Sequence, residues 1–255
     1  DDIKNAIRKN TKMVVVNHCS NVIGTIQPIA EIGKICKAAG VYLVIDASQS
    51  AGAVNIDMKA MGIDALAFTG HKCLMGPTGI GGSYIMENFP VRGTRFGGTG
   101  VRSAQKTHLT EFPFRMECGT LNTVGVAGLY AGTKWVLEQG IEKLHAQEIR
   151  LWEKLKKGVK DIENITLYCA DDPANRNAVL SLNLDKFDSG DVSTMLDVDY
   201  NIACRTGLQC APLVHEGIGT IDIHGTVRLS IGPFNTEAHI DAAIEALKDI
   251  ASIPR

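Results

Sequence analysis

The sequence has no long apolar run, no excess of charge of one sign and no closely paired cysteines. Its apolar stretches fall well short of the about 20 residues that a helix needs to span a bilayer. Its 26 basic and 28 acidic residues nearly balance, giving a formal net charge of −2 without any block of like charge. We therefore expect no membrane-spanning segment, and neither nucleic acid nor an anionic membrane as a partner.

Cysteine is present, but not in the spacing that holds zinc or forms a redox pair. The seven cysteines are scattered, and no Cys-x-x-Cys motif occurs. Their number is odd and no secretory leader opens the chain, so we expect reduced thiols, a cytoplasmic location and no metal site. The sequence begins Asp1-Asp2 without a methionine, and we expect further residues upstream.

The remaining composition is that of an ordinary globular protein. Of the 255 residues, 45% are hydrophobic and 21% are charged, which is enough to form one large domain or two modest ones. Strand-like and helix-like patterns alternate in the first half. Residues 13–16 are rich in valine, Pro28 and Gly40 bound a segment with isoleucines at helical spacing, and residues 41–45 are apolar again. This order predicts a right-handed β-α-β unit in a parallel sheet.

Further elements follow along the chain. Strands are predicted at 65–68, 83–86, 178–184 and 226–231, a helical pattern runs from 133 to about 159 with a break near Gly140, and an amphipathic helix follows Asn235. We predict an α/β large domain over residues 1–133, with a mostly parallel sheet flanked by helices. A smaller α+β domain is predicted over residues 134–255.

Polar residues follow three of the predicted strands, at 17–21, 46–49 and 69–72. Ligands of open α/β sheets collect at the carboxyl ends of strands, so these groups predict one site. Alone, Asp46 is compatible with a helix cap and Lys72 with a solvated surface lysine. Together they meet the needs of pyridoxal phosphate, which requires a lysine for its aldehyde, an acid for its pyridine nitrogen and several donors for its phosphate.

Five segments resemble one enzyme family. The segments N-H-C-S-N-V-I-G-T, D-A-S-Q-S-A-G and T-G-H-K-C-L-M-G-P-T-G-I-G are similar to those of class V aminotransferases, a group of fold-type I pyridoxal-phosphate enzymes. M-E-C-G-T-L-N-T resembles the segment with which that group reaches the neighbouring subunit's cofactor, and R-T-G-L-Q-C-A-P resembles the active-site cysteine segment of cysteine desulfurases. The likeness runs from about Met13 to the end, which implies a large domain without its N-terminal part.

The resemblance implies pyridoxal 5′-phosphate as the cofactor and a homodimer as the assembly. Lys72 would hold the cofactor covalently and move the substrate's α-proton, and Asp46 would pair with the pyridinium nitrogen. The full implied set of cofactor-binding residues is Asn21, Asp46, Gln49, Thr69, His71, Lys72 and, reaching the neighbouring subunit, Thr120. Within this set Gln49 would bond the ring hydroxyl, and Thr69 and His71 would bind the phosphate.

The same resemblance implies a reaction. Asn21, Arg205 and Arg228 would bind the substrate's carboxylate, a task suited to a guanidinium group. Lys72 and Cys210 would be catalytic, converting L-cysteine to L-alanine with a persulfide left on Cys210. Selenocysteine would react in the same way, and a further protein would accept the sulfur. Since only a thiolate is nucleophilic, we expect Cys210 to be exposed near positive charge, with Arg205 as one source.

Two alternatives stay open at this point. Another class V reaction, such as that of an aminotransferase or a lyase, uses the same cofactor residues. A non-catalytic fragment of the fold is the second alternative. Of the other candidate residues, we expect Cys36, Cys118 and Cys169 to be packed thiols, Cys73 to be structural, and His108, His215 and His224 to lie at the surface or behind the site rather than to bind metal.

Overall fold

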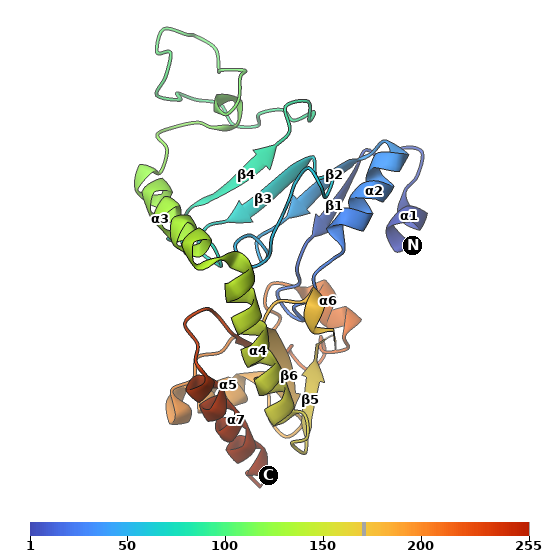
Figure 1. Cartoon of the computed structure of the whole chain (residues 1–255), viewed down its shortest axis with the longest axis vertical. Helices are drawn as coiled ribbons and strands as arrows, with labels where there is room; N and C mark the ends of the chain where they lie inside the picture. Colours follow the sequence, from blue (N-terminus) through green and yellow to red (C-terminus); the bar gives the residue numbers. More distant parts are fainter. Residues whose placement is uncertain (170–171, 255) are drawn as a thin grey trace.

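The computed structural model describes residues 1–169 and 172–254, which form two sheets joined through two consecutive helices (Figure 1). The first part contains α1 (Asp2–Ala6), β1 (Met13–Asn17), α2 (Ile29–Ala39), β2 (Tyr42–Asp46), β3 (Ala65–Thr69), β4 (Gly81–Ile85) and the 3-10 helix η1 (Phe114–Met116). The connecting helices are α3 (Thr123–Gln139) and α4 (Ile141–Val159). The second part contains β5 (Ile165–Tyr168), η2 (Pro173–Asn175), β6 (Val179–Leu184), α5 (Ser189–Tyr200), α6 (Pro212–Gly217), β7 (Val227–Ser230) and α7 (Glu237–Ser252).

The first sheet has the order β1-β2-β3-β4 and is mostly parallel, as predicted. The first three strands run in parallel, and β4 pairs antiparallel with β3. Asn17 pairs with Asp46, which in turn pairs with Ala67 on β3. The carboxyl ends of β1, β2 and β3 therefore lie side by side, where polar residues follow each strand.

Helix α2 covers one face of this sheet, and its ends follow from its sequence. Pro28 is the N-cap residue, and Gly40 ends the helix in the left-handed conformation with a φ of 66°. Ile29 and Ile32 are buried against the fully buried Leu43 of β2. The opposite face of the strand pair is open, because Val15 of β1 is 66% exposed.

The second sheet is antiparallel, with the order β5-β6-β7, and it carries its own core. Leu180 and Leu182 of β6 are fully buried, and α4, α5 and α7 supply the surrounding apolar side chains. Trp152 of α4 is 1% exposed and donates from its indole nitrogen to the carbonyl oxygen of Val179 (3.0 Å). The predicted α+β character of this part is confirmed.

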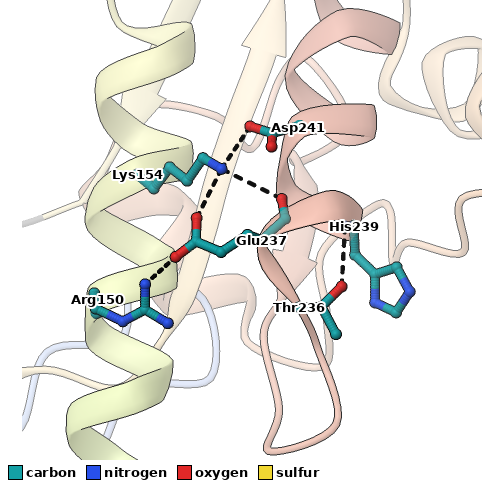
Figure 2. Close-up of polar contacts among 6 residues, drawn as sticks. All are labelled: Arg150, Lys154, Thr236, Glu237, His239 and Asp241. Carbon is teal, nitrogen blue, oxygen red and sulfur yellow. Dashed lines mark hydrogen bonds and ion pairs between the residues drawn. The ribbon is translucent and has the colours of Figure 1, made fainter.

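An ion-pair network joins α4 to α7 (Figure 2). Glu237, the first residue of α7, pairs with both Arg150 and Lys154 of α4. Lys154 also contacts Asp241 one turn further along α7, with a nitrogen–oxygen distance of 2.6 Å. Thr236 caps the helix, since its hydroxyl accepts from the backbone N–H of His239. The network fixes how the last helix lies on the second core.

Helix α3 begins ten residues earlier than the pattern predicts. The prediction began at residue 133, but α3 starts at Thr123 because Asn122 caps it and accepts from the N–H of Gly125 at 2.9 Å. The glycines of its first half made the segment look irregular. Gly132 is needed for close packing, since a Cβ there would lie 2.5 Å from the carbonyl oxygens of Leu74 and Met75. Residues 133 and 134, between which the domain boundary is predicted, lie inside α3, and that boundary stays a prediction.

Candidate active site

The site is built on the loop that follows β2. Asp46 ends that strand with its side chain exposed, and its Oδ1 accepts the backbone N–H of Ser48 at 2.8 Å. The neighbouring strands hold this loop: the N–H of Ala47 donates to the carbonyl oxygen of Ala67 (2.8 Å), and the N–H of His18 donates to that of Asp46 (3.0 Å). The Asp46 carboxylate is thereby fixed at the common end of three strands.

The loop after β3 carries Lys72 and is closed by its own backbone. Gly76 donates to the carbonyl oxygen of Gly70 (2.8 Å), and Met75 donates to that of Lys72 (2.9 Å). The two loops touch, because a Cβ on Gly52 would lie 2.6 Å from the carbonyl oxygen of Cys73. Lys72 is half-buried in this closed turn. The lysine and Asp46 thus come from adjoining loops at one sheet edge.

Two further predicted residues lie beside the lysine. Thr69 ends β3, and its Oγ1 lies 2.7 Å from Nδ1 of His71. His71 is exposed and Thr69 half-buried, so both side chains present polar atoms at the strand end. A hydroxyl and an imidazole N–H are suitable donors for a phosphate group.

Helix α3 supports the Lys72 loop from behind. Gly132 lies against the backbone of Leu74 and Met75, as described above. One turn earlier, a Cβ on Gly128 would lie 2.8 Å from Cδ of Pro77. The glycines place the helix axis close to the loop, so the position of Lys72 depends on α3.

The second part of the chain contributes Arg205 and Arg228, and both Arg228 and Gln209 are hydrogen-bonded to Asn21 of the first part. Arg205 and Arg228 pair through their backbones, with hydrogen bonds of 3.1 and 2.7 Å. Nη1 of Arg228 donates to the carbonyl oxygen of Asn21 (2.7 Å), and Nδ2 of Asn21 donates to that of Gln209 (2.6 Å). Asn21, from the loop after β1, therefore joins the first part of the chain to the segment that carries Cys210.

The electrostatic surroundings of Arg228 link it to Cys210. Burial is the main reason that the pKa of Arg228 lies below its ordinary value, the nearby Arg205 lowers it further, and Cys210 opposes both. Within the described residues, Nε of Arg228 is shielded from solvent and makes no hydrogen bond. Cys210 itself is exposed, in a left-handed backbone conformation with a φ of 60°. The Cys210 thiol is thus exposed, as expected, and the electrostatic influence of Cys210 reaches Arg228.

Gln49 and Thr120 complete the predicted set. Nδ2 of Asn177 donates to the carbonyl oxygen of Gln49 (2.6 Å), which ties the loop after β2 to the second part of the chain. Thr120 is exposed and does not join the cluster. It lies between β4 and α3, in the long segment that extends away from the sheet in Figure 1. Of the other predicted residues, Asp46 and Thr69 end β2 and β3, Asn21 and Lys72 lie in the loops after β1 and β3, Arg228 lies on β7, and Arg205 and Cys210 lie between α5 and α6.

Among the remaining cysteines and histidines, the expectation for Cys118 is wrong. Cys118, expected to be packed, is exposed because it lies in that extended segment. Cys36 is buried and Cys169 half-buried, as expected. His215 is fully buried behind the segment that carries Cys210, which is one of the two positions expected for it. Its position on α6, five residues after Cys210 on a helix opened by Pro212, was the signal available in the sequence.

Sequence reasoning also missed Glu148 on α4. Burial raises the pKa of this carboxyl to about 7. It acts on Cys73, the residue after Lys72: burial raises the pKa of the Cys73 thiol to about 11, and the Glu148 carboxylate adds to that effect. Cys73 is therefore a protonated structural thiol near neutral pH. No spacing in the sequence links residues 73 and 148.

The donor set fits pyridoxal phosphate. An amine, a carboxylate and the hydroxyl and imidazole donors come from the ends of neighbouring strands or the loops that follow them, and among the residues that the structure describes Nε of Arg228 has no hydrogen-bond partner. Across residues 1–169 and 172–254, no group of three or more His, Cys, Asp or Glu side chains is arranged to hold a metal.

In the same residue ranges, no helix is at once long and apolar enough to cross a membrane.

Comparison with known proteins agrees with this geometry. The family model described as aminotransferase class-V matches residues 1–243. A probable cysteine desulfurase of Methanothermobacter thermautotrophicus is 35% identical over 257 residues, which cover 98% of this chain and 63% of that protein. A cysteine desulfurase of Escherichia coli O157:H7 is 33% identical over 248 residues, covering 95% of this chain and 59% of that protein.

A solved structure is similar over the same range. The apo structure of the cysteine desulfurase from Thermococcus onnurineus superimposes with a TM-score of 0.86 at 34% identity, covering 98% of this chain and 62% of that one. The chain thus spans about three fifths of the length of the relatives that it matches.

Proposed function

The chain belongs to the class V aminotransferase family, and from this membership we propose that it acts as a cysteine desulfurase, alone or as part of a longer protein. The reaction is the conversion of L-cysteine and the Cys210 thiol into L-alanine and a persulfide on Cys210. The observation that carries the proposal is the exposed Cys210, whose neighbour Gln209 is bonded by Asn21, in the loop after β1, while Asn21 also accepts from Arg228.

The residues divide the work between binding and chemistry. Lys72 would hold pyridoxal phosphate covalently, Asp46 would pair with its pyridine nitrogen and Gln49 would bond its ring hydroxyl. Thr69 and His71 would bind its phosphate. When bound, this cofactor withdraws electrons from the α-carbon of an attached amino acid and so weakens the bond to the α-proton.

Three arrangements serve the substrate. The guanidinium groups of Arg228 and Arg205 bind the carboxylate, and Asn21 orients it. Lys72, whose amine is free once the substrate's amine has taken its place, would take the proton from the α-carbon. The Cys210 thiolate then attacks the substrate's sulfur, the bond between that sulfur and the β-carbon breaks, and a proton replaces the sulfur on the carbon. Selenocysteine carries selenium in place of this sulfur, is attacked by the Cys210 thiolate in the same way and is a second substrate.

The assembly and the location form part of the proposal. Thr120 serves the site of a second copy, because it is exposed on the extended segment between β4 and α3. The acceptor of the persulfide sulfur is another protein that reaches the exposed Cys210. All seven cysteines are free thiols, which supports a reducing compartment such as the cytoplasm.

The test is alanine production from L-cysteine by the purified chain with added pyridoxal phosphate and a thiol reductant. Cys210→Ala is expected to abolish alanine formation, while Cys118→Ala, which removes the other exposed thiol, is expected to leave it within about twofold of the parent. Lys72→Ala is expected to remove both the activity and the trapping of the cofactor by borohydride. Full turnover by Cys210→Ala contradicts the proposal.

The same assay separates the alternatives. An aminotransferase or a lyase acting on another amino acid converts its substrate without Cys210 and leaves no persulfide. A non-catalytic fragment shows neither visible absorbance with pyridoxal phosphate nor trapping at Lys72. The exposed cysteine next to Arg228 favours the desulfurase over both.

A further inference from the structure

The loop that carries Cys210 has an unfavourable backbone conformation. Gln209 and Cys210 have φ values of 43° and 60°, in the left-handed region that L side chains rarely adopt. Two consecutive residues of this kind persist only where surrounding contacts hold them. The contacts that hold this pair therefore determine where the Cys210 thiol lies.

The side chain of Gln209 makes the first of these contacts. Although it lies next to an exposed cysteine, Gln209 is only 4% exposed. Its Nε2 donates to the carbonyl oxygen of Thr226 at 2.7 Å, and its Oε1 lies 2.9 Å from Nε2 of His215. Its own carbonyl oxygen accepts from Asn21 at 2.6 Å. Side chain and backbone of Gln209 are thus both anchored.

His215 is the fixed end of this network. It is fully buried on α6, and its Nδ1 lies 2.7 Å from the hydroxyl of Thr220, which is also fully buried. Because the Gln209 amide must turn its Nε2 to the Thr226 carbonyl, its oxygen faces His215 and accepts a hydrogen bond from the N–H at His215 Nε2. Nδ1 then accepts from Thr220. Burial lowers the pKa of His215, which favours this neutral form.

The base of the loop is closed by glycines. A Cβ on Gly225 would lie 2.1 Å from the carbonyl oxygen of Gly207, so the two backbones are in direct contact. The N–H of Thr226 also donates to that Gly207 oxygen, at 3.2 Å. The loop therefore has a closely packed base and the side chain of Gln209 anchored inside it, while the next residue, Cys210, is exposed.

We propose that Gln209 and His215 are positioning residues for the Cys210 thiol, an inference that rests on Cys210 being the proposed nucleophile. Gln209 holds the left-handed turn by its buried amide, and His215 holds that amide. Asn21 links the same turn to Arg228, since it binds the Gln209 carbonyl with its side chain and the Arg228 guanidinium with its backbone. The network so keeps the thiol next to the cation.

The chain contains an internal standard for the test. Cys118 is exposed like Cys210 but lies between β4 and α3, away from this network. Brief treatment with iodoacetamide, followed by peptide mass spectrometry, gives the ratio of alkylation at Cys210 to that at Cys118. Since alkylation needs a thiolate and neither cofactor nor turnover, the ratio reports the surroundings of Cys210 alone.

His215→Leu removes the donor to Gln209 and is expected to lower this ratio about fivefold, because losing a buried hydrogen bond releases the turn and lets Cys210 leave Arg228. His215→Gln keeps an N–H donor on the buried side and is expected to retain the ratio within about twofold. If His215 serves only the stability of the fold, His215→Leu lowers the melting temperature without changing the ratio. An unchanged ratio in folded His215→Leu overturns the proposal.

A second variant covers the case in which His215→Leu does not fold. Thr220→Val removes only the hydroxyl that orients His215, and it is expected to lower the ratio about twofold. An unchanged ratio in this variant overturns the proposal equally.

Kinetics separate this inference from the proposed function. Where the chain makes alanine, His215→Leu is expected to lower kcat with little change in KM, since Lys72 and the arginines are untouched. If the chain makes no alanine but His215→Leu still lowers the alkylation ratio, the positioning inference holds and the proposed function fails. If the chain makes alanine but His215→Leu leaves the ratio unchanged, the proposed function holds and the positioning inference fails.

Discussion

Glu148 combines burial and charge at one position of α4. Its pKa of about 7, against an ordinary 4.5, means that the folded chain holds this proton between those values while the unfolded chain has released it. The stability gained from the bound proton is therefore lost as pH rises from 4.5 to 7. Above pH 7 the folded chain carries a desolvated carboxylate beside Cys73.

Glu148→Gln is therefore expected to raise the free energy of unfolding at pH 8 by about 1–3 kcal/mol and to leave it nearly unchanged at pH 4.5. Urea unfolding followed by circular dichroism at the two pH values measures the difference. Glu153→Gln, at an exposed position of the same helix, is the control and is expected to change stability by less than about 0.5 kcal/mol at both pH values. Equal effects of the two variants would contradict a desolvated Glu148.

At this scale the sequence predicted the strand-end residues, because motif and strand order together restrict where Asp46 and Lys72 lie. It did not predict Glu148, Gln209 or the burial of His215. The influence of Glu148 on Cys73 spans a long stretch of chain that residue spacing does not encode, and the burial of Gln209 and His215 depends on how the segment around Cys210 packs.

Helix α3 shows how an element fixes a site from behind. Gly132 lies at the middle of a helix, where alanine is ordinarily preferred by about 1 kcal/mol. Here the added methyl would overlap the carbonyl oxygens of Leu74 and Met75, which follow Lys72. The helix and the lysine loop must then separate.

Gly132→Ala is expected to lower stability by about 1–3 kcal/mol and to weaken retention of pyridoxal phosphate. Thermal unfolding and borohydride trapping measure the two effects. Gly190→Ala is the matched control, since Gly190 lies in α5 with no atom within 4 Å of an added Cβ. It is expected to be neutral or slightly stabilising, and a similar loss in both variants would rule out the close approach as the cause.

The ion pairs between α4 and α7 lead to a prediction about how the packing of these two helices contributes to stability. Glu237 sits in the first turn of α7, where a negative charge is favoured, and contacts two cations. Glu237→Gln is expected to lower stability by about 0.5–1 kcal/mol, and less at high salt. Glu138→Gln breaks a single exposed pair with Lys134 and is expected to change it by less than about 0.3 kcal/mol. Denaturant titrations at low and high salt distinguish the two, and the absence of any salt effect for Glu237→Gln would contradict an electrostatic origin.

Elements with strong periodicity were predicted from sequence and others were not. Strands β1, β2, β3, β6 and β7 and helices α2 and α7 lie where the pattern indicates. Helix α5 was missed because only Ser189, Val192 and Leu196 of its twelve residues are buried, which leaves little apolar periodicity. Strand β5 was missed because it has four residues and no fully buried side chain.

The two hydrophobic cores of the molecule differ in how completely their strands are buried. In the second core β6 is buried along nearly its whole length, between α4, α5 and α7. In the first, β1 alternates between exposed and half-buried residues, and Met13 and Val15 face solvent. The first sheet thus has apolar cover on one face only.

Backbone amides of β1 are expected to exchange hydrogen at least about tenfold faster than those of β6 in the 255-residue chain, because fewer buried contacts oppose local opening. Hydrogen exchange followed by mass spectrometry of peptides covering the two strands measures this. Equal protection in both strands would mean that the two cores open together.

Finally, the strand order leaves β1 and β4 each bonded to one neighbour within the described residues. Each outer strand therefore offers a row of backbone N–H and C=O groups that repeats along its length. At high protein concentration such rows act as templates on which further chains add strand by strand. Handling the chain dilute, or mixing it with a polypeptide that completes the sheet on both sides, is the way to keep it in solution.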